Sequence, residues 1–155
     1  MTNKFTFGLI NRKFHKVYQP DKAMKNDFIC PKCEGHLLVG GYIIFTITTK
    51  KGKRGLILLS PDLGDYSRVL NPGFTIEKGE GVDYFCPICH SNLTANDVDQ
   101  RLVRLLMIDE NAEKHEIYFS NVYGEYCTYK VSDKIYEKYG TASESYDGFF
   151  KTRRV

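Results

Sequence analysis

The chain has 155 residues, of which 42% are hydrophobic, 26% charged and 14% aromatic, with a formal net charge of +3. These are ordinary values for one globular domain, and the Tyr and Phe content favours strands. No run of 18 apolar residues is present, which excludes a membrane-spanning helix and a membrane partner. The first residues do not resemble a secretory signal, so we expect a cytoplasmic protein. Five cysteines, an odd number, argue against a disulfide framework.

Charge is distributed unevenly along the chain. Residues 1–54 contain 11 Lys and Arg against 3 Asp and Glu, whereas residues 55–150 contain 8 against 16. Two interpretations remain open. The two parts attract each other within one fold, or the basic part offers a surface to an acidic partner such as nucleic acid.

The first half of the chain is expected to contain an N-terminal arm followed by a β-hairpin. The arm covers residues 1–27, with a short strand at 5–10 and a turn at 19–22. Apolar residues alternate over 42–48, the period-two pattern of a strand, and 56–59 forms its return strand. Two further short strands are predicted at the ranges 74–76 and 82–85.

The second half is expected to add another hairpin. Residues 102–108 and 116–122 pair around a turn, and residues 126–131 alternate again. Residues 132–140 fit a short helix, although a strand fits almost as well, and residues 141–155 are predicted to be a weakly ordered tail. This order predicts one mostly β domain over residues 1–155, built of antiparallel sheet with little helix.

Four of the five cysteines form two Cys-Pro-x-Cys motifs. Cys30 and Cys33 are separated from Cys86 and Cys89 by 52 residues. Two cysteines three positions apart can turn their sulfurs toward one point, and a proline after the first suits the tight turn because it has no N–H to satisfy. Two such turns supply four thiolates, which match the closed tetrahedral shell of structural zinc. The alternative is that these are ordinary buried cysteines.

The paired motifs resemble those of the zinc-ribbon and rubredoxin-like superfamily. The resemblance covers the two motifs and a few flanking residues, and it implies that the four cysteines grip one ion between β-hairpins. The group often has glycine directly after the second cysteine of each motif, whereas Glu34 and His90 stand there in this chain. Four thiolates also suit a single iron, as in a rubredoxin-like electron carrier. Zinc is favoured because such carriers are small and acidic, whereas this chain is larger and slightly basic.

The cysteines and histidines also fit other kinds of site. The motif ending in His90 matches the haem-attachment pattern, but this leaves Cys30 and Cys33 unexplained. A thioredoxin-like redox motif needs a helix after the cysteines, and none is predicted there. Cys127 is expected to be a buried strand residue, and His115 is the candidate base if it were a nucleophile. His36 and His90 could replace a cysteine, but four thiolates already complete the shell.

No catalytic set, phosphate loop or dinucleotide fingerprint is found, so an enzyme is not favoured and no small-molecule substrate is evident. We expect a non-catalytic binding module held rigid by zinc, with either a protein or a nucleic acid as partner. The basic residues at the hairpin turn favour nucleic acid: Lys50, Lys51, Lys53 and Arg54. Aromatic residues near the C-terminus favour a protein-docking tail: Tyr139, Tyr146, Phe149 and Phe150.

Overall fold

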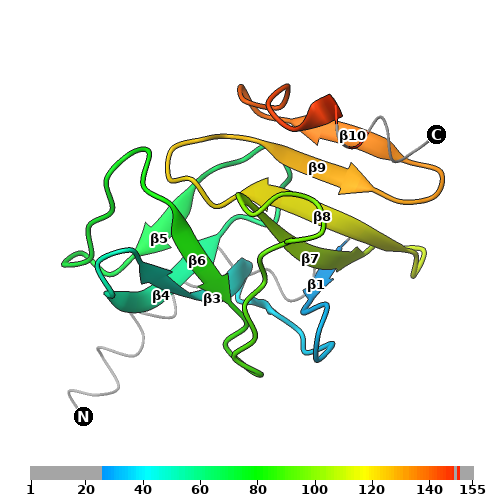
Figure 1. Ribbon diagram of the computed structural model, residues 1–155. Helices are drawn as coiled ribbons and strands as arrows, with labels where there is room; N and C mark the ends of the chain where they lie inside the picture. Colours follow the sequence, from blue (N-terminus) through cyan, green and yellow to red (C-terminus); the bar gives the residue numbers. More distant parts are fainter. Residues whose placement is uncertain (1–25, 149, 151–155) are drawn as a thin grey trace, which may run out of the picture.

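The computed structural model describes residues 26–148 and residue 150 (Figure 1). The expectations for residues 1–25, 149 and 151–155 lie outside these described residues. Strands make up 43% of the structure and helix 2%, which confirms the mostly β, antiparallel prediction. The strands are β1 (Asp27–Ile29), β2 (Leu38–Val39), β3 (Tyr42–Thr49), β4 (Arg54–Leu59), β5 (Arg68–Leu70), β6 (Val82–Phe85), β7 (Leu102–Ile108), β8 (Lys114–Ser120), β9 (Thr128–Val131) and β10 (Tyr136–Tyr139).

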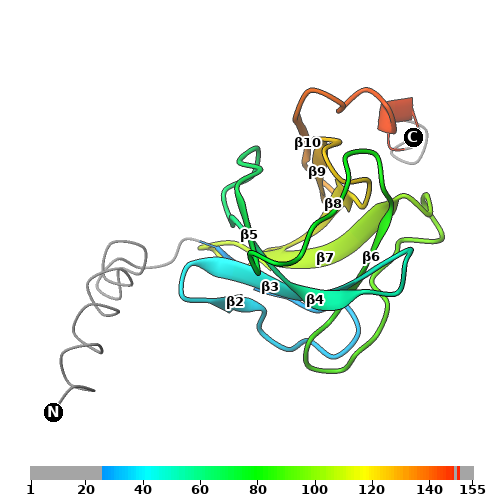
Figure 2. The ribbon, with the colours of Figure 1, turned by 90° about the vertical axis from the view of Figure 1, so that its left-hand side faces the viewer.

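The strands form two antiparallel sheets that face each other (Figures 1 and 2). Sheet A has the order β1-β7-β8-β9-β10, and sheet B has the order β2-β3-β4-β5, with β6 also paired to β3. Alternate residues of β3, β4, β7 and β8 point inward, because side chains in a strand alternate between its two faces. These inward residues form one apolar core between the sheets.

The two halves of the fold are built alike. The β3–β4 hairpin of sheet B corresponds to the β7–β8 hairpin of sheet A, and each turn has a residue with positive φ at the same place, Gly52 and Ala112. The core residues of the two hairpins recur 60 positions apart: Ile43, Phe45, Ile47 and Ile57 correspond to Val103, Leu105, Met107 and Ile117. The cysteine motifs were the only repeat predicted from the sequence, because the corresponding core residues are apolar in both hairpins but, apart from Ile57 and Ile117, not identical.

Each half donates its first strand to the other half's sheet. β1 precedes the first cysteine motif but pairs with β7 in sheet A, whereas β6 precedes the second motif and pairs with β3 in sheet B. After each motif the chain crosses to the opposite sheet: β2 joins β3, and Thr94 bridges to Val103 of β7. The cysteine motifs therefore lie where the chain passes between the sheets.

Most predicted strands are present, with shifts of one to two residues at several ends. The predicted strand at 74–76 is wrong: this segment has no strand pairing, and Phe74 instead packs its ring against Gly55. β2 and β5 were not predicted. Of the two readings for residues 132–140, the strand is correct, since β10 pairs with β9 and continues sheet A.

The segment after β10 covers the outer face of sheet A, and it lies beside β9 and β10 in both views (Figures 1 and 2). Tyr146 and Phe150 are buried there against Tyr118 and Tyr129, forming a second apolar cluster. Both residues lie within the range 141–155 that the sequence predicts to be a weakly ordered tail. Their burial also removes Tyr146 and Phe150 from the suggested docking tail.

Candidate metal centre

The two cysteine motifs fold into nearly identical turns, which we call knuckle 1 (residues 30–35) and knuckle 2 (residues 86–91). In each, the amide of the first cysteine donates to the carbonyl five residues later, at 3.0 Å in both knuckles. The carbonyl of the same cysteine accepts from the amide four residues later, at 2.9 Å in both. The equal spacing of the motifs thus produces the same local backbone twice.

Backbone amides point at the sulfur atoms. The amides of Lys32 and Cys33 lie 3.3 and 3.5 Å from Cys30 Sγ, and those of Ile88 and Cys89 lie 3.3 and 3.4 Å from Cys86 Sγ. Such N–H donors favour the charged form of a sulfur. The knuckles are therefore arranged to hold thiolates, which are the metal-binding form of cysteine.

Both knuckles place a residue other than glycine in the left-handed region. Glu34 has φ of 60° and His90 has φ of 67°. These are the positions where the zinc-ribbon group often has glycine, which adopts positive φ without steric cost. The local knuckle geometry thus persists without glycine, at a cost in backbone strain.

The four sulfurs of the predicted ligands converge on one point. Cys30 Sγ lies 3.8 Å from Cys89 Sγ, and Cys33 Sγ lies 3.8 Å from Cys86 Sγ. All four sulfurs lie within 4.8 Å of one another. A tetrahedron with metal–sulfur bonds of about 2.3 Å has sulfur–sulfur edges of about 3.8 Å, whereas a disulfide requires about 2.05 Å. The spacing therefore fits a shared metal ion and does not fit disulfides.

The cluster joins the two sheets. Knuckle 1 follows β1 of sheet A, and knuckle 2 follows β6 of sheet B. Each close sulfur pair combines one cysteine from each knuckle. An ion held here would fasten the sheets where the chain crosses between them.

The environments of the sulfurs differ. Burial raises the pKa of the Cys30 thiol to about 12 and also raises the pKa of Cys86. Hydrogen bonding to the Ser91 hydroxyl, 3.3 Å away, and to the Ser91 backbone lowers the pKa of Cys89 to about 6. A bound cation would favour the thiolate form at all four positions, because it replaces the lost solvation of the buried charge.

The other candidate residues lie outside this cluster. His36 is exposed and its Nδ1 lies 2.6 Å from Asp27 Oδ2, and His90 is also exposed. Cys127 is buried in the cluster on the outer face of sheet A, and burial raises the pKa of its thiol to about 12. His115 shares the inward face of β8 with Ile117. His115 and Cys127 therefore lie on opposite faces of sheet A and cannot act as a nucleophile–base pair.

A second group of possible metal ligands was missed by the sequence analysis. Asp109, Glu113 and His115 place one ligand atom each within 4.8 Å of the others at the β7–β8 turn. Asp109 Oδ1 already accepts the amides of Asn111 and Glu113 at 2.9 Å, and its Oδ2 lies 2.8 Å from His115 Nε2. These hydrogen bonds stabilise the β7–β8 turn and explain why the three side chains lie together without a metal ion.

The residues around each cysteine motif follow the same pattern, which could have predicted that the two knuckles have the same flanking structure. Phe28 and Tyr84 stand two positions before the first cysteine, and Leu37 and Leu93 stand seven positions after it. In each half the amide of the leucine donates to the carbonyl of the aromatic residue, at 2.8 and 2.9 Å. All four side chains are buried.

Comparison with known proteins gives no match for this chain, whether with protein-family models, curated proteins or solved structures. No helix within the described residues is both long and apolar enough to cross a membrane. The four-cysteine cluster, consistent with a zinc-ribbon-like site, is therefore the feature on which a functional assignment rests.

Proposed function

We propose that the chain is a structural zinc protein in which Cys30, Cys33, Cys86 and Cys89 bind one Zn²⁺ and thereby lock two β-sheets together. One observation carries the proposal: the four sulfurs of two knuckles, which follow strands of different sheets, lie within 4.8 Å of one another, and two of their distances equal the 3.8 Å edge of a thiolate tetrahedron. A shell of four protein ligands leaves no open position for a catalytic water, which supports a structural role for the ion.

Metal content tests the identity of the ion. Protein purified without added metal, from medium containing both zinc and iron, should contain one zinc per chain by mass spectrometry. An iron stoichiometry near one would reject zinc and favour the rubredoxin-like alternative, because four thiolates accept either ion. A chain without either metal would reject the proposal as a whole.

Removal of the metal tests the structural role. Structural zinc contributes directly to folding, so a strong chelator should abolish the cooperative thermal transition seen by circular dichroism. Re-addition of Zn²⁺ should restore it. If the transition is unchanged after complete removal of the metal, the ion does not hold the sheets together.

We further propose that the rigid β-scaffold serves as a non-catalytic module that binds a macromolecule. The outer face of sheet B supports a protein partner, because Val39, Leu56 and Val69 are 60%, 55% and 46% exposed on it. Ile44 and Leu58 lie on the same face and are half-buried. Apolar side chains gathered on one sheet face are typical of contact surfaces.

This face is tested by comparing crosslinked partners of the wild type with those of a double variant, Leu56→Ser and Val69→Ser. A partner crosslinked by the wild type and lost in the variant supports this surface. A matched double change at exposed residues elsewhere, Thr75→Ser and Lys134→Ser, should retain the partner. Equal capture by all three proteins rejects the face as the contact.

Nucleic-acid binding is the second candidate, favoured by the β3–β4 turn. Lys50, Lys51, Lys53 and Arg54 are all exposed there, and in the described part of the chain none forms an ion pair with a carboxylate. Four unpaired cations within five residues can neutralise several phosphates. For single-stranded nucleic acid, each phosphate contact steepens the slope of log K against log salt concentration by about 0.7.

Fluorescence anisotropy with a single-stranded oligonucleotide tests this candidate. Changing all four residues to Gln should abolish binding at low salt. A control with four other lysines changed to Gln should bind like the wild type: Lys78, Lys114, Lys130 and Lys134. Absence of wild-type binding at low salt, or equal loss in both variants, would reject the turn as a nucleic-acid site.

A further inference from the structure

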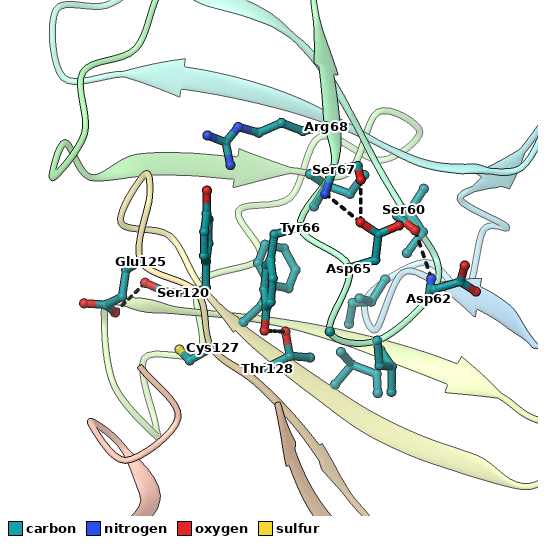
Figure 3. Close-up of a pocket in the computed structure, with 18 of the residues that line it drawn as sticks. Ser60, Asp62, Asp65, Tyr66, Ser67, Arg68, Ser120, Glu125, Cys127 and Thr128 are labelled. Atoms are coloured by element: carbon teal, nitrogen blue, oxygen red, sulfur yellow. Dashed lines mark hydrogen bonds between the residues drawn. The ribbon is translucent and has the colours of Figure 1, made fainter. Parts of the chain in front are cut away.

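A cavity of about 90 Å³ lies between the inner faces of the two sheets, beneath two loops (Figure 3). One loop spans residues 60–67, before β5, and the other spans residues 121–127, before β9. The loops occupy equivalent places in the two halves of the fold. Their contact includes Tyr66, whose ring stacks on that of Tyr126 at 4.7 Å and whose hydroxyl lies 2.9 Å from Thr128 Oγ1.

The floor of the cavity is aromatic. Phe45, Tyr84 and Phe119 line it and contact one another, with ring centroids 5.1 to 5.7 Å apart. Leu105 and Ile117 add aliphatic wall. Aromatic edges and faces presented in this way suit a flat apolar group, which would stack or meet them edge-on.

Arg68 supplies a positive charge at the wall of this cavity. Its Nε donates a hydrogen bond to the Tyr123 hydroxyl at 2.8 Å, and its guanidinium lies 3.9 Å from the centroid of the Tyr123 ring. Within the described residues it forms no ion pair with a carboxylate, although it is partly buried. The Tyr126 side chain is a further hydrogen-bond partner of the guanidinium. Because arginine has five N–H donors in a planar fork, donors remain for bidentate binding of a carboxylate.

Two of the three acidic residues that line the cavity already have hydrogen-bond partners. Asp65 accepts hydrogen bonds from the amide and hydroxyl of Ser67. Glu125 Oε1 accepts the hydroxyls of Ser120 and Tyr146, each at 2.7 Å. Figure 3 shows Asp62 and Asp65 across Tyr66 from the Arg68 guanidinium. These carboxylates therefore do not neutralise Arg68.

Tyr84 provides a second polar group without a partner. Its side chain is 6% exposed and lines the cavity, yet its hydroxyl forms no hydrogen bond with any residue that the structure describes. Burial raises the pKa of Tyr84, so the hydroxyl stays neutral and able to donate. A ligand oxygen in the cavity would give this hydroxyl a hydrogen-bond partner.

We propose that this cavity binds a small organic carboxylate with a single ring or a short aliphatic body, its carboxylate on Arg68 and its apolar body against Phe45 and Phe119. The volume of the cavity limits the size of the ligand. One water molecule needs about 10–15 Å³, and the cavity of about 90 Å³ holds several times that amount. The ligand lies between the sheets and uses no residue of the cysteine cluster, so it can bind whether or not the chain has a macromolecular partner.

Three probes with a single ring test the charge preference on the zinc-loaded full chain. Benzoate, benzamide and benzylamine share one ring and differ in charge, and binding is followed by amide chemical shifts in nuclear magnetic resonance. Benzoate should bind at least tenfold more tightly than benzamide, because charge-assisted hydrogen bonds are about twice as strong as neutral ones. Equal binding of benzoate and benzamide, tighter binding of benzylamine, or no binding of any probe would overturn the proposal.

Variants locate the site. Arg68→Met should reduce benzoate binding to the level of benzamide, while Lys134→Met, at an exposed residue outside the cavity, should leave it unchanged. Arg68→Lys retains the charge without the planar fork and should give an intermediate affinity. Tyr84→Phe keeps the ring packing and should weaken benzoate severalfold. Unchanged benzoate affinity in both Arg68→Met and Tyr84→Phe, with folding confirmed by circular dichroism, would contradict the assignment.

Discussion

The left-handed residues of the two knuckles offer a quantitative test of the local geometry. Glu34 and His90 have φ of 60° and 67°, values that are costly for any side chain with a Cβ atom. Both side chains are exposed, so replacing either with glycine removes strain and takes little packing away. We therefore expect Glu34→Gly and His90→Gly each to stabilise the protein.

The magnitude follows from two opposing contributions. A left-handed residue costs about 1–2 kcal/mol in the folded state, whereas glycine costs roughly 0.5–1 kcal/mol through the greater freedom of the unfolded chain. The expected net gain is about 0.5–1 kcal/mol per substitution. For a chain of this size, 1 kcal/mol raises the melting temperature by about 2–4 °C.

Thermal unfolding at a fixed excess of zinc measures this difference, because metal binding contributes to the apparent stability. Lys32→Gly is the matched control: it lies in knuckle 1 at a position without positive φ, so glycine there should lower the melting temperature. The two knuckle substitutions should also be additive, since each acts on its own turn. Destabilisation by both Glu34→Gly and His90→Gly would refute the knuckle geometry.

Three further predictions concern the ligands, the odd cysteine and the C-terminal segment. Cys30→Ala should weaken zinc affinity more than 100-fold in a chelator competition, because even residues that only hydrogen-bond to metal ligands contribute about 10–100-fold. The control Cys127→Ala should retain one zinc. Equal loss of metal in both variants would contradict the assignment. The folded pKa of Cys127, about 12, exceeds its unfolded value of 9.0, so its contribution to stability is complete below pH 9 and is lost as pH rises toward 12. Urea unfolding at successive pH values should therefore show a decline that is shallower in Cys127→Ala by about 1.4 kcal/mol per pH unit, and parallel curves would show that the thiol is not buried. Phe150→Ala should lower stability by about 3–5 kcal/mol in the same assay, because its ring is buried against Tyr118 and Tyr129, and a change below 0.5 kcal/mol would place it outside the core.

The cysteine cluster could be predicted from sequence because its information is local. A cysteine, a proline and a second cysteine three positions on define a turn, and two such turns suggest a shared ion. The β3–β4 and β7–β8 hairpins were equally accessible, since their alternation and turns lie within short windows of sequence.

What could not be predicted depends on contacts between distant parts of the chain. β1 and β6 are short strands whose own residues do not say which sheet they join, so the exchange of first strands between the halves was invisible. Residues 132–140 have a helix-like start and end, but pairing with β9 decides in favour of a strand. The cavity at Arg68 brings together loops near residues 60 and 120, which no local pattern connects.

X-ray absorption at the zinc edge of the purified protein tests the shared metal site most directly. We expect four sulfur neighbours at about 2.3 Å and no nitrogen or oxygen in the first shell, because each of the four cysteines supplies one ligand. A first shell with fewer than four sulfurs, or with nitrogen or oxygen at about 2.0 Å, would contradict a single ion held by Cys30, Cys33, Cys86 and Cys89.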